Sequence, residues 1–502
     1  MSTSRNSGYQ HPFINARIYH NGAGEHPRSV SELGMVRLSA ELRSRHGWWK
    51  KYKDPEVRKQ WTKEASNKQI RAGKHALLTL EEHQINYVLD ELSGYADLRD
   101  DETGIQVSCF DRIWECDIFP DDSNNLLSLK HIDFLRSKTI TGTNSDIIVN
   151  PFRHCYIQGR THVRSDSAIS EELKQESLIA STRDSIASAY SPKFASLPAM
   201  VSVYPTESRV QYETYINGLD PQLSDTYTAL QNLLGKCIKL FENVLTSLHR
   251  SNPLPHRIPH KYGRIIWPGP ETPSESDDED VWEEYRHDFE MCREIILPDI
   301  PDTGYKQDNL KFNHRVHFND GQKIQVIHRI VDIHLDKERN HIYDSYWHVT
   351  GTKNERVVAC ALHFVSVENI DDASIEFRMA VEFPPIDFLG DEEGMFRTYG
   401  LSETGHCNQS IGKVTLRTGL TIAFPNVYQQ HVAPQQSSWI YRALETSIDR
   451  RLPHELLERI INMTESVLTE EEADEYHQKM LKEMEKFTRY NNYCFFELDF
   501  IL

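Results

Sequence analysis

Two histidines beside apolar segments are the residues of this chain best placed to do chemistry. His348 lies within Trp347–Val349, and His431 follows an apolar segment that ends in Phe424–Asn426, 83 positions after His348. Two strand-borne histidines and one carboxylate form the facial triad that holds non-haem Fe(II) and leaves positions open for oxygen chemistry. The pattern therefore predicts an iron site with His348 and His431 as ligands.

The carboxylate of such a triad is harder to place. It is expected two residues after the first histidine, because residues i and i+2 of a strand project from the same face, but Thr350 stands there. Glu355, beyond a turn at Gly351, and Asp344, on the other side of His348, are the alternative carboxylates, although neither spacing is standard. The sequence thus points to an iron oxygenase and also to a copy that could be inactive.

Each histidine also has a simpler interpretation. A histidine at the end of a strand can hydrogen-bond to neighbouring backbone and bind no metal at all, because buried side-chain nitrogens need hydrogen-bond partners. This structural interpretation stays open for both His348 and His431.

The bulk properties describe a globular protein of 502 residues, with 38% hydrophobic and 26% charged residues. No apolar run approaches the roughly 18–20 residues that span a bilayer, and the N-terminal residues lack the apolar core of a signal peptide. The eight cysteines are scattered without a Cys-x-x-Cys pair, which predicts reduced thiols in a cytoplasmic or nuclear protein and no membrane partner.

The charge is strongly negative but uneven. A net charge of −19 argues against nucleic-acid binding, yet Arg37–Lys74 holds 12 Lys and Arg against 4 Asp and Glu, with Trp48, Trp49 and Trp61 interleaved. Such a segment could contact phosphates or present its tryptophans to a partner. The alternative is a helical region whose cationic face docks on the acidic remainder of the chain.

Helical patterns dominate the first half of the chain. Capping residues predict helices that begin near Ser29, Asp54 and Thr79, the last of them running to Gly94. The strongest helical stripe covers Asp225–His249 and ends at a proline-rich segment.

Beyond residue 320 the apolar period changes to that of strands. Val357–Phe364 is apolar on both faces and predicts a buried central strand. Ile375–Val381 alternates as a strand with one wet face does, and Arg417–Gly419 is interpreted as the turn of a hairpin. Nothing from Pro434 to Leu498 alternates like a strand.

The predicted fold class is α+β, with a helical N-terminal region and a C-terminal jelly-roll-like barrel, a double-stranded β-helix that lacks a final strand. The expected divisions are a helical region 1–100, mixed short elements 101–164, a Ser-rich linker 165–191, a helical support region 192–320 with an acidic loop 271–284, a β-rich region 321–433 and C-terminal helices 434–502.

Collinear sequence blocks resemble a fungal family known only as domain of unknown function 4246. They are Trp48–Lys50, Lys59–Trp61, Ser108–Trp114, Gly159–His162, Tyr215–Leu219, Tyr262–Arg264, Trp347–Val349, Asn354–Glu355, Phe377–Arg378 and Phe424–Asn426. The C-terminal half of that family is similar to iron and 2-oxoglutarate dioxygenases. The resemblance implies Fe(II) and 2-oxoglutarate as cofactors, with His348 and His431 as the two histidine ligands.

In that class of enzymes a final strand carries a basic residue for the far carboxylate of 2-oxoglutarate. Arg442, eleven positions after His431, has a suitable spacing, but Trp439–Leu444 is interpreted as helix, which makes Arg442 a surface residue. The substrate, a small molecule or a protein, is not indicated.

Two functions therefore stay open. The first is an Fe(II)/2-oxoglutarate-dependent oxygenase that hydroxylates a C–H bond. The second is a non-catalytic protein that uses the barrel and the basic, Trp-rich N-terminal region as a binding platform. Serine-hydrolase, zincin, P-loop and dinucleotide-binding patterns are absent from the sequence.

Overall fold

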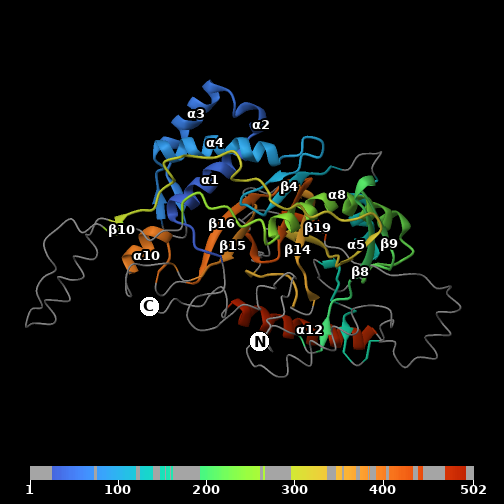
Figure 1. The fold of residues 1–502 in the computed structure, drawn as a ribbon. Coiled ribbons are helices and arrows are strands. Elements are labelled where there is room, and N and C mark those ends of the chain that lie inside the picture. The colour runs from blue at the N-terminus through green and yellow to red at the C-terminus, as the bar shows by residue number, and fades with distance from the viewer. Residues whose placement is uncertain are drawn as a thin grey trace, which may run out of the picture.

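The structure is a computed structural model in which two β-sheets lie face to face and helices cover them (Figure 1). It describes residues 25–72, 76–119, 125–138, 147–152, 154–158, 160–161, 191, 193–259, 264–265, 295–335, 346–352, 355–368, 373–382, 384, 392–402, 406–433, 439–444 and 470–492. The predicted linker 165–191, except Ser191, and the predicted acidic loop 271–284 lie outside these residues, as does Asp344.

The larger sheet has seven strands, all antiparallel to their neighbours. Their spatial order is β3-β4-β17-β14-β19-β13-β5. The strands span Gln106–Val107 (β3), Trp114–Asp117 (β4), Ile147–Val149 (β5), Ile330–Leu335 (β13), Ala359–Glu368 (β14), Leu420–Pro425 (β17) and Trp439–Leu444 (β19).

The smaller sheet has the order β16-β15-β18, with β15 at Ser374–Ala380, β16 at Asn408–Thr415 and β18 at Tyr428–Ala433. Residues 346–350 extend it by one antiparallel bridge between His348 and Gln430. Among the described residues these strands form open sheets, and they do not close into a barrel.

The space between the two sheets is filled by apolar side chains. Phe377 of β15 packs against Phe424 of β17 with ring centroids 5.0 Å apart, and both residues belong to a buried cluster that includes Ile375, Met379 and Ile422. Burying each such side chain contributes roughly 1.5–3 kcal/mol. Alternate residues of β15 and β17 therefore define the inner face of this β-sandwich.

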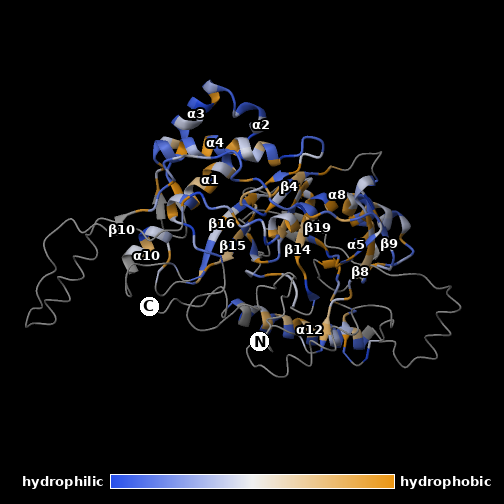
Figure 2. Cartoon of the chain, viewed as in Figure 1, coloured by the Kyte–Doolittle hydropathy of each residue, from blue (hydrophilic) through white to orange (hydrophobic). Residues whose placement is uncertain are grey.

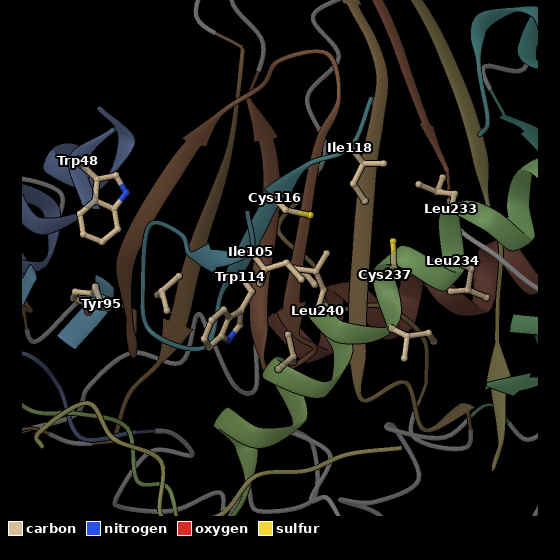
Figure 3. Packing of buried hydrophobic residues seen from close by; sticks show 14 of the residues in the cluster. Trp48, Tyr95, Ile105, Trp114, Cys116, Ile118, Leu233, Leu234, Cys237 and Leu240 are labelled. Atoms are coloured by element: carbon tan, nitrogen blue, oxygen red, sulfur yellow. The ribbon is translucent and has the colours of Figure 1, made fainter. Parts of the chain in front are cut away.

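Helix α8 (Ser224–Leu248) covers the outer face of the large sheet. Its buried residues share a hydrophobic cluster with Trp114 and Ala423, and Figure 3 shows this packing, with Cys237 and Leu240 directed toward the strands. The predicted stripe of Asp225–His249 is confirmed. Figure 2 shows the same division, because hydrophobic residues follow the strands and α8 while α3 is mostly hydrophilic.

The N-terminal helices α1–α4 gather at one end of the molecule (Figure 1). The predicted starts at Ser29 and Asp54 are confirmed, since both side chains accept backbone N–H groups at the helix starts. The prediction for the third long helix was wrong at both ends, because Glu81 and Gln84 form its capping box and the helix continues past Gly94. The four helices are α1 (Val30–Ser44), α2 (Trp48–Lys51), α3 (Pro55–Ser66) and α4 (Glu82–Leu98).

The remaining elements are short, apart from one C-terminal helix. They are α5 (Leu129–Lys138), α10 (Glu392–Tyr399), α12 (Glu470–Asn491), a 3₁₀ turn at Pro205–Glu207, β1 (Ile70–Ala72), β2 (Ala76–Leu78), β6 (Tyr156–Ile157), β7 (Phe194–Ala195), β8 (Ala199–Tyr204), β9 (Arg209–Tyr212), β10 (Arg264–Ile265), β11 (Ile295–Ile296) and β12 (Gln322–Val326). Helix α12 packs on a separate small cluster around Phe194 and Met480.

Three predictions about the strands were wrong. The turn at Arg417–Gly419 does not close a hairpin, because β16 pairs with β15 whereas β17 pairs with β14 and β4, so the chain changes sheets there. The outer face of β15 is not wet, since Arg378 is buried. Trp439–Leu444 is strand β19 rather than helix, and it lies between β13 and β14. The large sheet therefore contains a final strand, β19, that the sequence pattern did not predict.

Candidate functional site

Residues 346–352, which contain His348, are held against the small sheet by backbone hydrogen bonds. The His348 N–H donates to the Gln430 carbonyl at 3.3 Å, and the Gln430 N–H donates back to the His348 carbonyl at 3.0 Å. Two residues that exchange both bonds lie directly opposite each other, and their side chains share one face of the sheet. His348 and Gln430 therefore point to the same side.

That side is the interior of the sandwich. Gln430 also lies opposite Phe377 of β15, and Phe377 is completely buried between the sheets. Burial lowers the pKa of His348, the hydrogen bond to Tyr346 raises it, and the nearby charges of Arg329 and His431 lower it further. The imidazole of His348 is thus favoured in its neutral form.

Both ring nitrogens of His348 face protein groups. Nδ1 lies 2.8 Å from the Tyr346 carbonyl oxygen, which can only accept, so Nδ1 carries the proton. Nε2 is then the acceptor, and the Gln430 side-chain amide faces it at 3.5 Å. This arrangement matches the structural interpretation of a strand-end histidine bonded to its surroundings.

His431 is the next residue along β18 and lies on the opposite face. It stands opposite Glu376 of β15, and successive residues of a strand project to opposite faces. The ring of Trp347 stacks on the imidazole of His431 with centroids 5.0 Å apart and an angle of 24° between the planes. The Arg378 guanidinium lies over the same indole at 4.7 Å.

The structure therefore brings His431 together with Trp347 and does not bring it together with His348. The two imidazoles that were predicted to share an iron ion are directed to different sides of one sheet. The physical reason is that successive residues of a strand face opposite sides of the sheet. The bridge places His348 on the same side as Gln430, so His431, which follows Gln430, faces the other side.

Glu355, the candidate carboxylate that the structure describes, has both oxygens engaged by backbone groups. Glu355 accepts the backbone N–H groups of Thr352 and Ser196, each at 2.7 Å, so its two oxygens hold the turn that contains Gly351. Thr350 donates its backbone N–H to the Asn426 carboxamide at 2.8 Å. Among the residues that the structure describes, no three His, Cys, Asp or Glu side chains are placed to hold one metal ion.

Asn426 explains why Phe424–Asn426 and Trp347–Val349 stand out together in the sequence. Its side chain is buried and donates to the carbonyl oxygens of Thr350 at 2.7 Å and Val357 at 2.9 Å, besides accepting the Thr350 N–H. One carboxamide thus fastens residues 346–352 to the edge of the sandwich.

Arg442 lies in β19, where its backbone stands opposite Asp332 of β13 and Ser366 of β14. The interpretation of Trp439–Leu444 as a helix was wrong, because a short segment without alternation cannot be assigned to helix or strand from its period alone.

The tryptophans of the N-terminal region are largely packed inside the protein. Trp48 and Trp61 are 1% and 5% exposed, and Trp49 is covered by Arg99, whose guanidinium lies 3.7 Å from the indole centroid. Several cations of the same region are paired with neighbouring acids, as Arg58 is with Asp90 at 2.6 Å. Arg45 and Lys68 pair with Glu41 and Glu64 of the same region, so the docking of a cationic face on the acidic remainder of the chain stays a prediction.

A buried cluster of charges was missed by the sequence reasoning. Arg257, 2% exposed, bonds to Glu91 at 2.9 Å and Asp111 at 3.2 Å and donates to the Tyr95 hydroxyl at 2.5 Å. The Arg257 backbone N–H also donates to Glu32 at 2.9 Å. In the sequence Arg257 stands in a proline-rich segment, and nothing there distinguishes it from an exposed arginine.

Two family models match this chain. The family described as Protein of unknown function (DUF4246) matches residues 82–438, and its N-terminal companion, Domain of unknown function DUF4246, N-terminal, matches residues 1–64. The chain therefore belongs to the DUF4246 family, as the resemblance predicted. Neither a curated protein nor a solved structure matches it. In the described residues no helix is long and apolar enough to cross a membrane.

Proposed function

We propose that this chain is a non-catalytic member of the DUF4246 family that uses its β-sandwich as a binding scaffold. The proposal rests on one observation, the antiparallel bridge between His348 and Gln430. The bridge directs His348 and His431 to opposite faces of the small sheet and leaves Trp347 stacked on His431. Fe(II) does not fit these residues, so no chemical step is derived through it.

The scaffold itself is proposed to be jelly-roll-like. A jelly roll alternates its strands between two sheets, and here β13, β14, β17 and β19 lie in the large sheet while β15, β16 and β18 lie in the small one. The bridge at His348 adds a fourth segment to the small sheet, between β13 and β14 in the chain. This alternation supports the proposal of a common architecture with the iron oxygenases.

The second candidate is an Fe(II)/2-oxoglutarate-dependent oxygenase. Strand β19 favours it, because a strand with a basic residue, Arg442, follows His431 as the resemblance requires. This function would need His348 and His431 to converge on one face of the sheet, which requires a one-residue shift between residues 346–350 and β18.

Anaerobic titration of the full chain with Fe(II) and 2-oxoglutarate separates the two candidates. We expect no visible charge-transfer band in the wild type, and none in Thr350→Asp, because a carboxylate beside His348 would still lack the second imidazole. The matched control is His348→Ala. A band in the wild type that His348→Ala abolishes would overturn the proposal and establish the metal site.

A further inference from the structure

The end of the sandwich beside Tyr428 is sealed by residues 25–32. Tyr428 of β18 and Gln409 of β16 both lie opposite Met379 of β15, so the three side chains form one row across the inner face. The Gln409 carboxamide accepts the backbone N–H of Arg28 and donates to its carbonyl oxygen, both at 2.8 Å. These two bonds fix Arg28 at the end of the row.

The guanidinium of Arg28 is buried, with 1% of the residue exposed. Its Nη1 donates to Glu32 at 2.9 Å, while Nε and Nη2 have no hydrogen-bond partner in the part of the chain that the structure describes. Nε–H and the adjacent Nη2–H point along one edge of the guanidinium, the geometry that binds two oxygens of a carboxylate or a phosphate. A buried edge of this kind without a partner is costly.

Two further polar groups, Arg112 and the Tyr428 hydroxyl, lie near the Arg28 guanidinium. Arg112 donates through Nη1 to Glu25 at 2.6 Å, and its Nε has no partner among the described residues. The Tyr428 hydroxyl is buried and lies beside the Arg112 side chain, which is its hydrogen-bonding neighbour. Burial raises the pKa of Tyr428, and the charges of Arg112, Glu25, Asp111 and Arg28 all act on it, which places these groups around one hydroxyl.

The charge around the site does not oppose an anion. Four buried or half-buried guanidiniums face four carboxylates, namely Arg28, Arg43, Arg112 and Arg257 against Glu25, Glu32, Glu91 and Asp111. Burial raises the pKa of Glu91, Arg257 lowers it, and Asp111 raises it further, with a net upward shift. Four guanidiniums against four carboxylates leave the cluster without a formal surplus of negative charge.

We propose that the unpaired edge of Arg28, together with Arg112 Nε and the Tyr428 hydroxyl, forms a binding site for a small oxyanion, a phosphate or a carboxylate. Solvent reaches residues next to the site, because Glu25, which pairs with Arg112, is 39% exposed and His26 is 53% exposed. It does not depend on the function proposed above, since no group of the His348 segment takes part.

Thermal unfolding of the full chain with inorganic phosphate or with acetate tests this site, against chloride at equal ionic strength. A ligand that binds only the folded state raises Tm with its concentration, and we expect a saturable rise of about 2–5 °C with at least one of the two anions. Phosphate and acetate distinguish the two sources of the oxyanion. Tyr428→Phe, which keeps the ring in the core, should shrink the rise, and Arg28→Lys, which removes the two-donor edge, should abolish it.

Arg58→Lys is the matched control, because Arg58 pairs with exposed Asp90 far from the sandwich interior. It should leave the anion-dependent rise unchanged. If neither anion raises Tm above chloride, or if all variants respond equally, buried water satisfies these donors and the proposed site does not exist. Isothermal titration of Tyr428→Phe provides a second measurement should Arg28→Lys fail to fold.

Discussion

The two ends of strand β18 organise polar groups in different ways. At the Tyr428 end, charged side chains from several distant segments converge in the interior and pair with one another. At the His431 end, two imidazoles that are close along the sheet diverge to opposite faces, and neutral hydrogen bonds hold the chain. The face of the sheet to which a residue points, which alternates along the strand, therefore decides which residues can act together.

The largest expected effect tests the charged end. Arg257→Met leaves the buried carboxylates of Glu91 and Asp111 without their guanidinium, and breaking a buried pair typically costs about 3–5 kcal/mol. The free energy of unfolding in urea should fall by this amount. Arg58→Met, which breaks a pair whose side chains are 30% and 56% exposed, should change it by about 0–1 kcal/mol. Equal losses in the two variants would contradict the expectation that the buried Arg257 pairs matter more for stability than the exposed Arg58 pair.

A pH series separates charged from neutral interior groups. Burial lowers the pKa of His363 from 6.5 to about 4, and its Nδ1 lies 2.9 Å from the Thr421 hydroxyl. In the unfolded chain His363 binds a proton below pH 6.5, whereas in the folded chain it binds one only below about pH 4. The free energy of unfolding therefore falls as the pH falls from 6.5 to 4. The loss is about 3 kcal/mol at 1.36 kcal/mol per pKa unit.

The control for this series is His363→Gln, which cannot titrate. Its stability should fall less steeply between pH 6.5 and 4 than that of the wild type, and the difference between the two curves isolates His363 from the acids of the charged cluster. Parallel curves would mean that His363 is not held neutral in the folded protein.

A smaller effect tests the neutral end. Asn426→Ala removes one acceptor and two donors that fasten residues 346–352, and unpaired buried backbone groups cost about 1–3 kcal/mol. We expect a loss of about 2 kcal/mol in urea, and faster hydrogen exchange at the amide of Thr350. A loss without faster exchange there would show that Asn426 acts elsewhere.

The sequence predicted the elements that have one dominant period. The stripe of α8 and the capping residues Ser29 and Asp54 are local signals, and the structure confirms them. Strand β19 was missed because Trp439–Leu444 is a short segment without polar–apolar alternation, and periodicity alone does not separate such a segment from helix.

The prediction of a site at His348 and His431 rests on a weaker kind of signal, the spacing of two residues in the chain. The 83 positions between His348 and His431 do not fix the register between residues 346–350 and β18, and a shift of one residue exchanges the faces of a strand. The Arg28 site was not visible at all, because its members are brought together only by contacts between segments such as residues 25–32, 108–113 and β18.

The position of β19 also constrains the order of assembly. Residues 439–444 are the last of the large sheet to be synthesised, yet they lie between β13 and β14. Until they emerge from the ribosome, the facing edges of those two strands present unpaired N–H and C=O groups to other chains. Because these contacts are so distant in sequence, we expect slow folding and a nascent protein that needs protection from self-association until residue 444 is available.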